Sequence, residues 1–137
     1  MEHTIGIMLM GQRANPLLVI VGGRKEELTM PLYMTQFAYT PEAWAALVDN
    51  PEDRSAPVRE LTEAMGGRVI GWYLSFGEYD GLVIYETLDN ATAGAAALAA
   101  ASLGHLRAVK TTPLFSAEES VELMRRAGGA SFRAPGQ

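Results

Sequence analysis

Two apolar runs separated by a short turn constrain the fold of this chain more than any other feature. The first run covers residues 69–76, with the sequence VIGWYLSF, and the second covers residues 82–86, with the sequence LVIYE. Between them lie residues 77–81, GEYDG. Branched and aromatic residues favour strands, whereas glycine and aspartate favour the turn between paired strands. The segment therefore predicts an antiparallel hairpin.

The composition indicates one globular domain and excludes several classes of site. The chain has 137 residues, of which 48% are hydrophobic and 20% charged, which suits a single domain with a hydrophobic core. The net charge of -5 and the lack of a basic block argue against nucleic-acid binding. Because the chain contains no cysteine, it has no disulfide, no zinc-thiolate site and no cysteine nucleophile.

No segment of the sequence predicts insertion into a membrane or export. The longest apolar run near the N-terminus is Leu17 to Val21, which is far too short to span a bilayer. Residues 1–16 lack the basic region and the longer apolar region of a signal peptide. We therefore expect a cytoplasmic protein that binds neither membranes nor nucleic acids.

The first 29 residues differ from the rest of the chain and end in a Gly-Gly break followed by a charged patch. Our hypothesis is that the domain covers residues 30–127 and that residues 1–29 are an extension. This extension is either a wrongly assigned start or an additional edge strand at residues 17–21. Residues 128–137 predict a flexible tail.

The residues before the hairpin predict a strand and then a helical segment. Residues 32–39 form the strand, and Thr40 can cap a helix that begins at Pro41, where a missing N–H costs nothing. The helix is expected to pause at Asn50, which can cap a restart, and to end at residues 66–67.

The residues after the hairpin predict a helix, a strand and a final helix. Asp89 can cap an alanine-rich helix over residues 91–101, and a strand follows at residues 106–114. Residues 116–119 form a capping box that opens a last helix to about Ala127. The order β-α-β-β-α-β predicts an α+β fold of the ferredoxin-like type with an antiparallel sheet and an extra C-terminal helix.

Residues 30–127 resemble the GYD domain family, small bacterial proteins of largely unassigned function. The resemblance depends on the order and spacing of Tyr39-Thr40-Pro41-Glu42, Gly66-Gly67, Trp72-Tyr73, Gly77-Glu78-Tyr79-Asp80 and Asp89. It implies a ferredoxin-like subunit of the dimeric α+β barrel type. It implies no established reaction and has no counterpart for residues 1–29.

The hairpin also predicts a homodimer. If Ser75 pairs with Leu82, then Tyr73 lies opposite Ile84 and shares a sheet face with Glu86. Both faces of such a sheet are rich in apolar groups, while helices cover only one of them. The other face must then be buried by a second copy or a ligand.

Three side chains are the candidates for acid–base chemistry. Tyr73 and Glu86 can meet on one face of the sheet, and a buried glutamate beside a phenol could transfer a proton. His105 lies beside Arg107 and could act as a base or bind an anion. The alternatives are a solvated glutamate, a tyrosine in the core and a surface histidine. A lone histidine is a poor metal site, so we expect neither a metal nor a cofactor.

The turn residues Gly77, Glu78, Tyr79 and Asp80 allow two interpretations. The two carboxylates around a phenol could form the lip of a pocket and orient a ligand. Alternatively, these residues only shape the turn, and Tyr79 packs against its neighbours.

We therefore expect a homodimeric module that binds a small molecule between the sheet and the partner subunit. The side chains expected to line that site are Tyr33, Phe37, Tyr73, Ile84 and Glu86. One alternative is a cofactor-independent enzyme of the monooxygenase or isomerase type, and another is a purely structural or interaction protein. Whether the chain is an enzyme stays open. A cavity of roughly 300 Å³ or more would distinguish the first two functions from the third.

Overall fold

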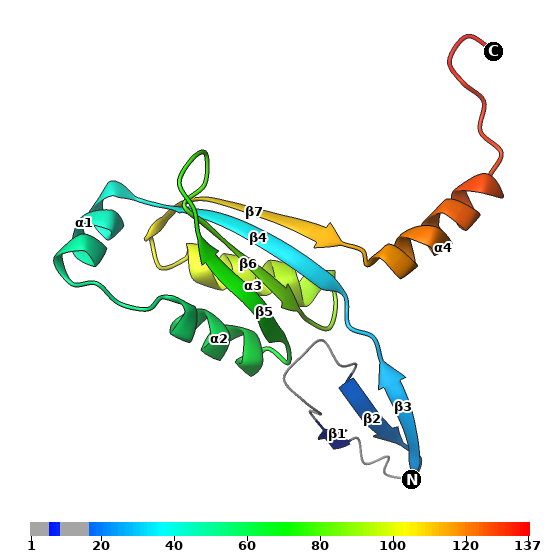
Figure 1. The fold of residues 1–137 in the computed structure, drawn as a ribbon, viewed down its shortest axis with the longest axis horizontal. Helices are drawn as coiled ribbons and strands as arrows, with labels where there is room; N and C mark the ends of the chain where they lie inside the picture. Colours follow the sequence, from blue (N-terminus) through cyan, green and yellow to red (C-terminus); the bar gives the residue numbers. More distant parts are fainter. Residues whose placement is uncertain (1–5, 9–16) are drawn as a thin grey trace.

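The computed structural model describes residues 6–8 and 17–137. The elements in chain order are β1 Gly6–Met8, β2 Leu17–Val21, β3 Arg24–Leu28, β4 Leu32–Tyr39, α1 Pro41–Asp49, α2 Ser55–Ala64, β5 Arg68–Leu74, β6 Gly81–Glu86, α3 Asn90–Ala101, β7 Leu106–Leu114 and α4 Ala117–Gly128. Figure 1 shows the sheet of β4 to β7 with α2 and α3 alongside it, and α4 projecting beyond the end of β7.

The four-stranded sheet has the order β5-β6-β4-β7, and its neighbouring strands are antiparallel. In chain order, the helices α1 and α2 follow the first strand β4, and α3 follows the hairpin of β5 and β6. Together with the strand order of the sheet, this is the split βαβ arrangement. The predicted α+β, ferredoxin-like fold with an extra C-terminal helix is thereby confirmed.

The predicted hairpin forms, but its register differs from the assumed one by two residues. Tyr73 lies opposite Leu82, rather than opposite Ile84, and β5 ends at Leu74. The ladder is shorter because Ser75 and Asp80 already close the loop, through a 2.8 Å bond from the amide of Ser75 to the carbonyl of Asp80. A shift of two residues keeps every side chain near the turn on its predicted face.

The first helical segment is divided as expected, although Asn50 has another role. Thr40 caps α1, and its hydroxyl accepts a hydrogen bond from the Ala43 amide. The sequence predicted that Asn50 caps the start of the second helix. In the structure, Asn50 instead ends α1 as its C-cap. The second helix begins at Ser55, where the Asp53 carboxylate accepts bonds from the amide and the hydroxyl of Ser55.

The two faces of the sheet follow from the pairing of β4 with β6. Tyr33 lies opposite Tyr85, and both are buried on the face covered by α2 and α3. Met34 lies opposite Ile84, so these two side chains point to the other face, because neighbours along a strand alternate. No described helix packs along that second face closely enough to bury Met34 or Ile84. We call it the open face.

Tyr73 extends across the open face over Gly71. A Cβ atom placed at Gly71 would lie 2.8 Å from the Tyr73 ring, so the absence of a side chain there lets the ring approach the strand. The ring is 59% exposed.

The N-terminal strands form a second, three-stranded antiparallel sheet in the order β1-β2-β3. Residues 17–21 are a strand, but it pairs with β1 and β3 and not with an edge of the four-stranded sheet. The residues at 24–28, interpreted from the sequence as a charged patch, form β3. The rest of the predicted extension, residues 1–5 and 9–16, lies outside the described residues.

The capping box predicted at residues 116–119 is present. The Ser116 hydroxyl accepts from the Glu119 amide, and the Glu119 carboxylate accepts from the Ser116 amide. Within α4, which is described in full, no residue is buried, and Val121 and Met124 are exposed.

Candidate functional site

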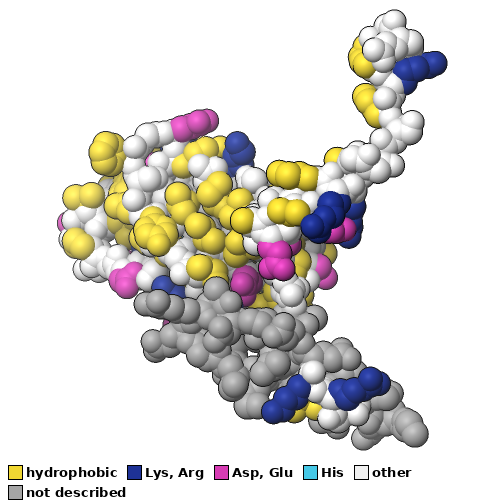
Figure 2. Space-filling view, turned by 45° about the vertical axis from the view of Figure 1, so that its right-hand side comes forward, with side chains coloured by type: hydrophobic (Ala, Val, Ile, Leu, Met, Phe, Trp, Pro, Cys, Tyr) yellow, Lys and Arg dark blue, Asp and Glu magenta, His cyan; other side chains and the backbone are white. Residues whose placement is uncertain are grey.

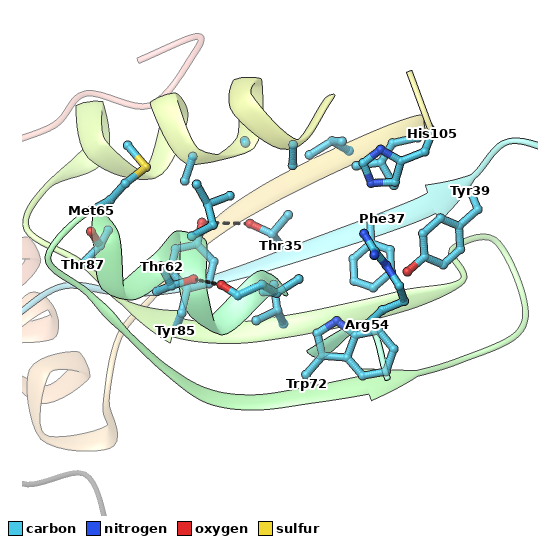
Figure 3. Close-up of a pocket in the computed structure, with 18 residues that line it drawn as sticks. Thr35, Phe37, Tyr39, Arg54, Thr62, Met65, Trp72, Tyr85, Thr87 and His105 are labelled. Atoms are coloured by element: carbon cyan, nitrogen blue, oxygen red, sulfur yellow. Dashed lines mark hydrogen bonds between the residues drawn. The ribbon is translucent and has the colours of Figure 1, made fainter. Parts of the chain in front are cut away.

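An apolar cavity of about 90 Å³ lies between the covered face of the sheet and the helices α2 and α3. It is lined by Val58 and Leu61 of α2, by Ala97 and Ala100 of α3, and by Val83 and Val109 of the sheet. Figure 3 shows these elements enclosing it. We call it the inner cavity.

The alanine-rich sequence of α3 explains why this space is empty. Ala96, Ala97 and Ala100 line the inner cavity, while Ala95 and Ala99 on the same helix are exposed. Alanine keeps a strong helix propensity but carries only one methyl group, so it leaves room where a leucine would fill the gap.

Two threonine hydroxyls that line the cavity have partners within the chain. The Thr35 hydroxyl lies 2.9 Å from the Tyr85 hydroxyl and 2.8 Å from the Thr111 hydroxyl. The Thr62 hydroxyl donates to the carbonyl of Val58 at 2.7 Å. A bound molecule therefore meets an apolar surface there and needs no polar group of its own at that end.

The other end of the inner cavity is polar and opens to the surface. Arg54, Tyr39, Trp72 and His105 line this end, which we call the mouth (Figure 3). Arg54 and Tyr39 also line two outer hollows of about 450 and 240 Å³ next to α1. The mouth thus borders both the inner cavity and the two outer hollows.

The mouth carries one cation and several hydrogen-bond donors. One guanidinium nitrogen of Arg54 bonds the Glu52 carboxylate at 3.0 Å. Burial raises the pKa of the Tyr39 phenol, although the neighbouring Arg54 opposes the rise, so the phenol stays protonated at neutral pH. Burial, and then the charge of Arg54, lower the pKa of His105, which keeps its imidazole neutral at pH 7.

The indole N–H of Trp72 is a donor without a partner. Its Nε1 atom is buried and has no hydrogen-bond partner among the described residues, while its ring packs against Phe37 at 5.8 Å between centroids. Buried donors are normally paired, so an orphaned one beside a cavity marks a place for an acceptor.

Asp80 holds the mouth together. Its Oδ2 atom accepts from the Tyr39 amide at 2.8 Å and from the Trp44 indole at 3.0 Å, and its own amide donates to the carbonyl of Phe37. This ties the hairpin turn to the end of β4 and the start of α1. Of the predicted turn residues, Asp80 is therefore the one that bonds two other elements, β4 and α1.

The other turn residues lie away from the inner cavity. Gly77 has a φ of 157° and Glu78 is exposed, while the carbonyl of Tyr79 accepts from the Ser75 hydroxyl at 3.0 Å. The carbonyl of Glu78 lies 3.4 Å from a guanidinium nitrogen of Arg107. The two carboxylates do not converge, because Asp80 is engaged by β4 and α1.

The five side chains predicted to line one ligand site lie on two faces of the sheet. Tyr33 and Phe37 are buried on the covered face, whereas Tyr73, Ile84 and Glu86 belong to the open face. The predicted set is divided because side chains alternate along β4: Tyr33 lies opposite Tyr85, and not opposite Ile84.

The three acid–base candidates do not meet. Glu86 lies opposite Arg68 at one end of the hairpin, where Arg68 Nε donates to Glu86 Oε2 at 2.8 Å. Tyr73 lies near the other end, opposite Leu82. His105 lines the mouth on the covered face. The two-residue shift in register separates Tyr73 from Glu86.

The sequence reasoning missed Arg54 as a site residue. The helix break at residues 50–51 indicated a connection between two helices, but a sequence does not tell which way an arginine in such a connection points. The tight loop at Asp53 and Ser55 sets the start of α2 and with it the position of Arg54.

The described residues contain neither a metal-binding cluster nor a helix that could span a membrane. Residues 6–8 and 17–137 contain no group of three or more histidine, aspartate or glutamate side chains arranged to hold a metal ion. Within the same residues, every helix is too short or too polar to cross a bilayer.

Comparison with known proteins identifies relatives of this chain. Residues 33–124 match the GYD domain. A protein of Thermus thermophilus, named "Glutamine synthetase and cystathionine beta-lyase binding protein", is 33% identical over 78 residues, which are 57% of this chain and 82% of the relative. No solved structure matches the chain.

Proposed function

This chain belongs to the GYD domain family, and from that premise we propose that it is a homodimeric protein that binds a small molecule in the inner cavity. The binding face is the covered one, beneath α2 and α3, rather than the space between the sheet and a partner subunit.

The observation that carries this proposal is the enclosed apolar space with a polar mouth. Ligand sites are mostly apolar, with a few polar groups that fix orientation. The inner cavity alone, at about 90 Å³, is smaller than the roughly 300 Å³ of a drug-sized site. Tyr39, Arg54 and His105 of the mouth also line an outer hollow of about 450 Å³, which gives a ligand at the mouth additional room.

The open face supports the homodimer. Leu32, Met34, Leu82, Ile84 and Leu114 lie on this face by their register, and all five are only half-buried. Figure 2 shows hydrophobic side chains gathered over the body of the domain, with charged groups mostly at its margins. These apolar side chains share the open face with polar ones such as Gln36 and Lys110. A partly exposed apolar surface of this kind favours association with a second copy.

Native mass spectrometry of the protein purified from its own host tests the proposal. We expect the mass of a dimer with an additional small-molecule mass. Ala97→Leu should abolish the additional mass, because three more carbons fill most of the inner cavity.

The matched control is Ala95→Leu, which makes the same change on the exposed side of α3. It should retain the additional mass. A wild-type dimer without any bound molecule, or an equal loss in both variants, would contradict binding in the inner cavity.

A second candidate function is binding to an enzyme. It is favoured by the name of the relative from Thermus thermophilus and by α4, whose Val121 and Met124 are exposed on a helix that packs on no described element. Size-exclusion chromatography of the chain with glutamine synthetase, or with cystathionine β-lyase, should give a joint peak. Met124→Glu should remove it, and separate peaks for the wild type would exclude this function.

A further inference from the structure

The mouth of the inner cavity determines which kind of molecule the site accepts. Its four polar side chains, Arg54, Tyr39, Trp72 and His105, come from four different elements or connections and gather at one end of the cavity (Figure 3). The inference below rests on the proposed binding function and specifies the chemistry of the ligand.

The groups at the mouth offer donors and one positive charge. The Arg54 guanidinium has five N–H groups, and one of its terminal nitrogens donates to the Glu52 carboxylate at 3.0 Å. The Trp72 indole can only donate, and it has no partner among the described residues.

The acidic groups nearby do not satisfy this arrangement. The Asp80 carboxylate already accepts from the Tyr39 amide and the Trp44 indole. The Glu52 side chain is about half exposed at 53%, so its bond to Arg54 is weak and easily exchanged for a better acceptor. A ligand that complements the mouth therefore brings an anionic group with two acceptor oxygens.

The apolar end of the site determines which tail the ligand can carry. The inner cavity is apolar, and its volume of about 90 Å³ is below the roughly 150 Å³ of a cavity that holds benzene. It accepts only the last few carbons of an alkyl chain, so the carbons next to the head group lie in the mouth, and a long chain does not fit.

We propose that the site binds a short apolar carboxylic acid, with the alkyl tail in the inner cavity and the carboxylate on Arg54. Arginine and carboxylate form two parallel hydrogen bonds, which is the strongest pairing available to this set of groups. The neutral imidazole of His105 and the indole of Trp72 supply further N–H groups at the same end.

Calorimetry with hexanoate and hexanamide tests the charge requirement. Both molecules have the same tail, so they differ only in the head group. We expect hexanoate to bind the wild type on the order of tenfold to a hundredfold more tightly, as a charged hydrogen bond predicts. Arg54→Gln should remove this preference, whereas Arg59→Gln, which removes an exposed arginine of α2 outside the cavity, should keep it.

Glu52→Gln should change the affinity for hexanoate in the direction opposite to that of Arg54→Gln. Without the competing carboxylate, hexanoate should bind more tightly than to the wild type, and hexanamide should be unchanged. Histidine resonances provide another readout. Burial, and then the charge of Arg54, lower the pKa of His105, so bound hexanoate should raise this pKa by offsetting the Arg54 charge.

The outcomes separate this inference from the proposed function. Equal affinity for hexanoate and hexanamide, or an equal effect of Arg54→Gln and Arg59→Gln, overturns the carboxylate assignment but leaves binding in the cavity intact. Tighter binding of hexyl phosphate than of hexanoate also overturns it. If none of the three probes binds, the inference fails, while the additional mass in the native protein and its loss in Ala97→Leu still decide the proposed function.

Discussion

The two faces of the four-stranded sheet are built from the same strands, but their side chains differ in burial and in hydrogen bonding. On the covered face, Tyr33 stacks on Tyr85 at 5.8 Å and its hydroxyl donates to Asn90 at 2.6 Å. On the open face, Tyr73 is 59% exposed and Ile84 is only half-buried. The covered face therefore carries the stability and the cavity of the single chain, while the open face carries surface that a second copy can bury.

The contrast between the two faces shows that alternate residues of one strand can have different roles. One set packs within the chain, and the other set is available for contact with another chain. In β4, Tyr33 and Thr35 serve the covered face, and Met34 serves the open one. Three experiments can break or sharpen this division.

The largest effect is expected on stability. Tyr33→Ala should lower the free energy of unfolding by about 3–5 kcal/mol, because it removes a ring that is only 2% exposed and leaves Asn90 without its partner. Tyr73→Ala on the open face should cost about 0.5 kcal/mol. Urea denaturation at low protein concentration, where a dimer contributes least, measures both. Similar losses for the two variants would contradict the division of the faces.

The second effect is expected on association. Ile84→Lys places a charge in the middle of the open face, so the dissociation constant of the homodimer should rise about tenfold or more. Sedimentation at several concentrations measures the change. Ala95→Lys, which adds the same charge on the exposed side of α3, is the control and should leave the dimer intact. A wild type that stays monomeric would refute the role of the open face.

The smallest effect is expected in the dependence of stability on pH. The pKa of His105 is lower in the folded chain than its usual value of about 6.5, so the unfolded chain takes up the proton first. The stability associated with the neutral imidazole is complete above about pH 6.5 and declines as the pH falls through the lowered folded value. His105→Gln should lose less stability between pH 7 and pH 5 than the wild type does, as thermal unfolding at both values would show. An identical decline in both would contradict the burial of His105 at the mouth.

Most of the fold could be predicted from local sequence patterns. Thr40, Asp89 and Ser116 cap the helices that they were expected to cap, because a capping side chain bonds amides only two or three residues away. The register of the hairpin could not be predicted, since it depends on Asp80, whose partners Tyr39 and Trp44 lie far away in the sequence.

The candidate site was the part that sequence reasoning predicted least well. Strand alternation in β4 was visible, but nothing local indicated which of the two sets of residues the helices would cover. The inner cavity exists because the alanines of α3 are too small to fill the gap between this helix and the sheet. The gap forms only when the elements pack, so no local sequence pattern reports it.

Gly71 gives the open face a property that the covered face lacks. The ring of Tyr73 lies over this glycine, and a single added methyl group would displace the ring, which is the free end of a side chain and can move. On the covered side, a methyl group at Gly81 would instead approach the Phe37 ring at 2.4 Å and the Tyr73 carbonyl at 2.9 Å. One carbon at position 71 can thus reshape the open face while the covered face keeps its packing. The two faces of the sheet can therefore change independently, through substitutions on opposite sides of the same strands.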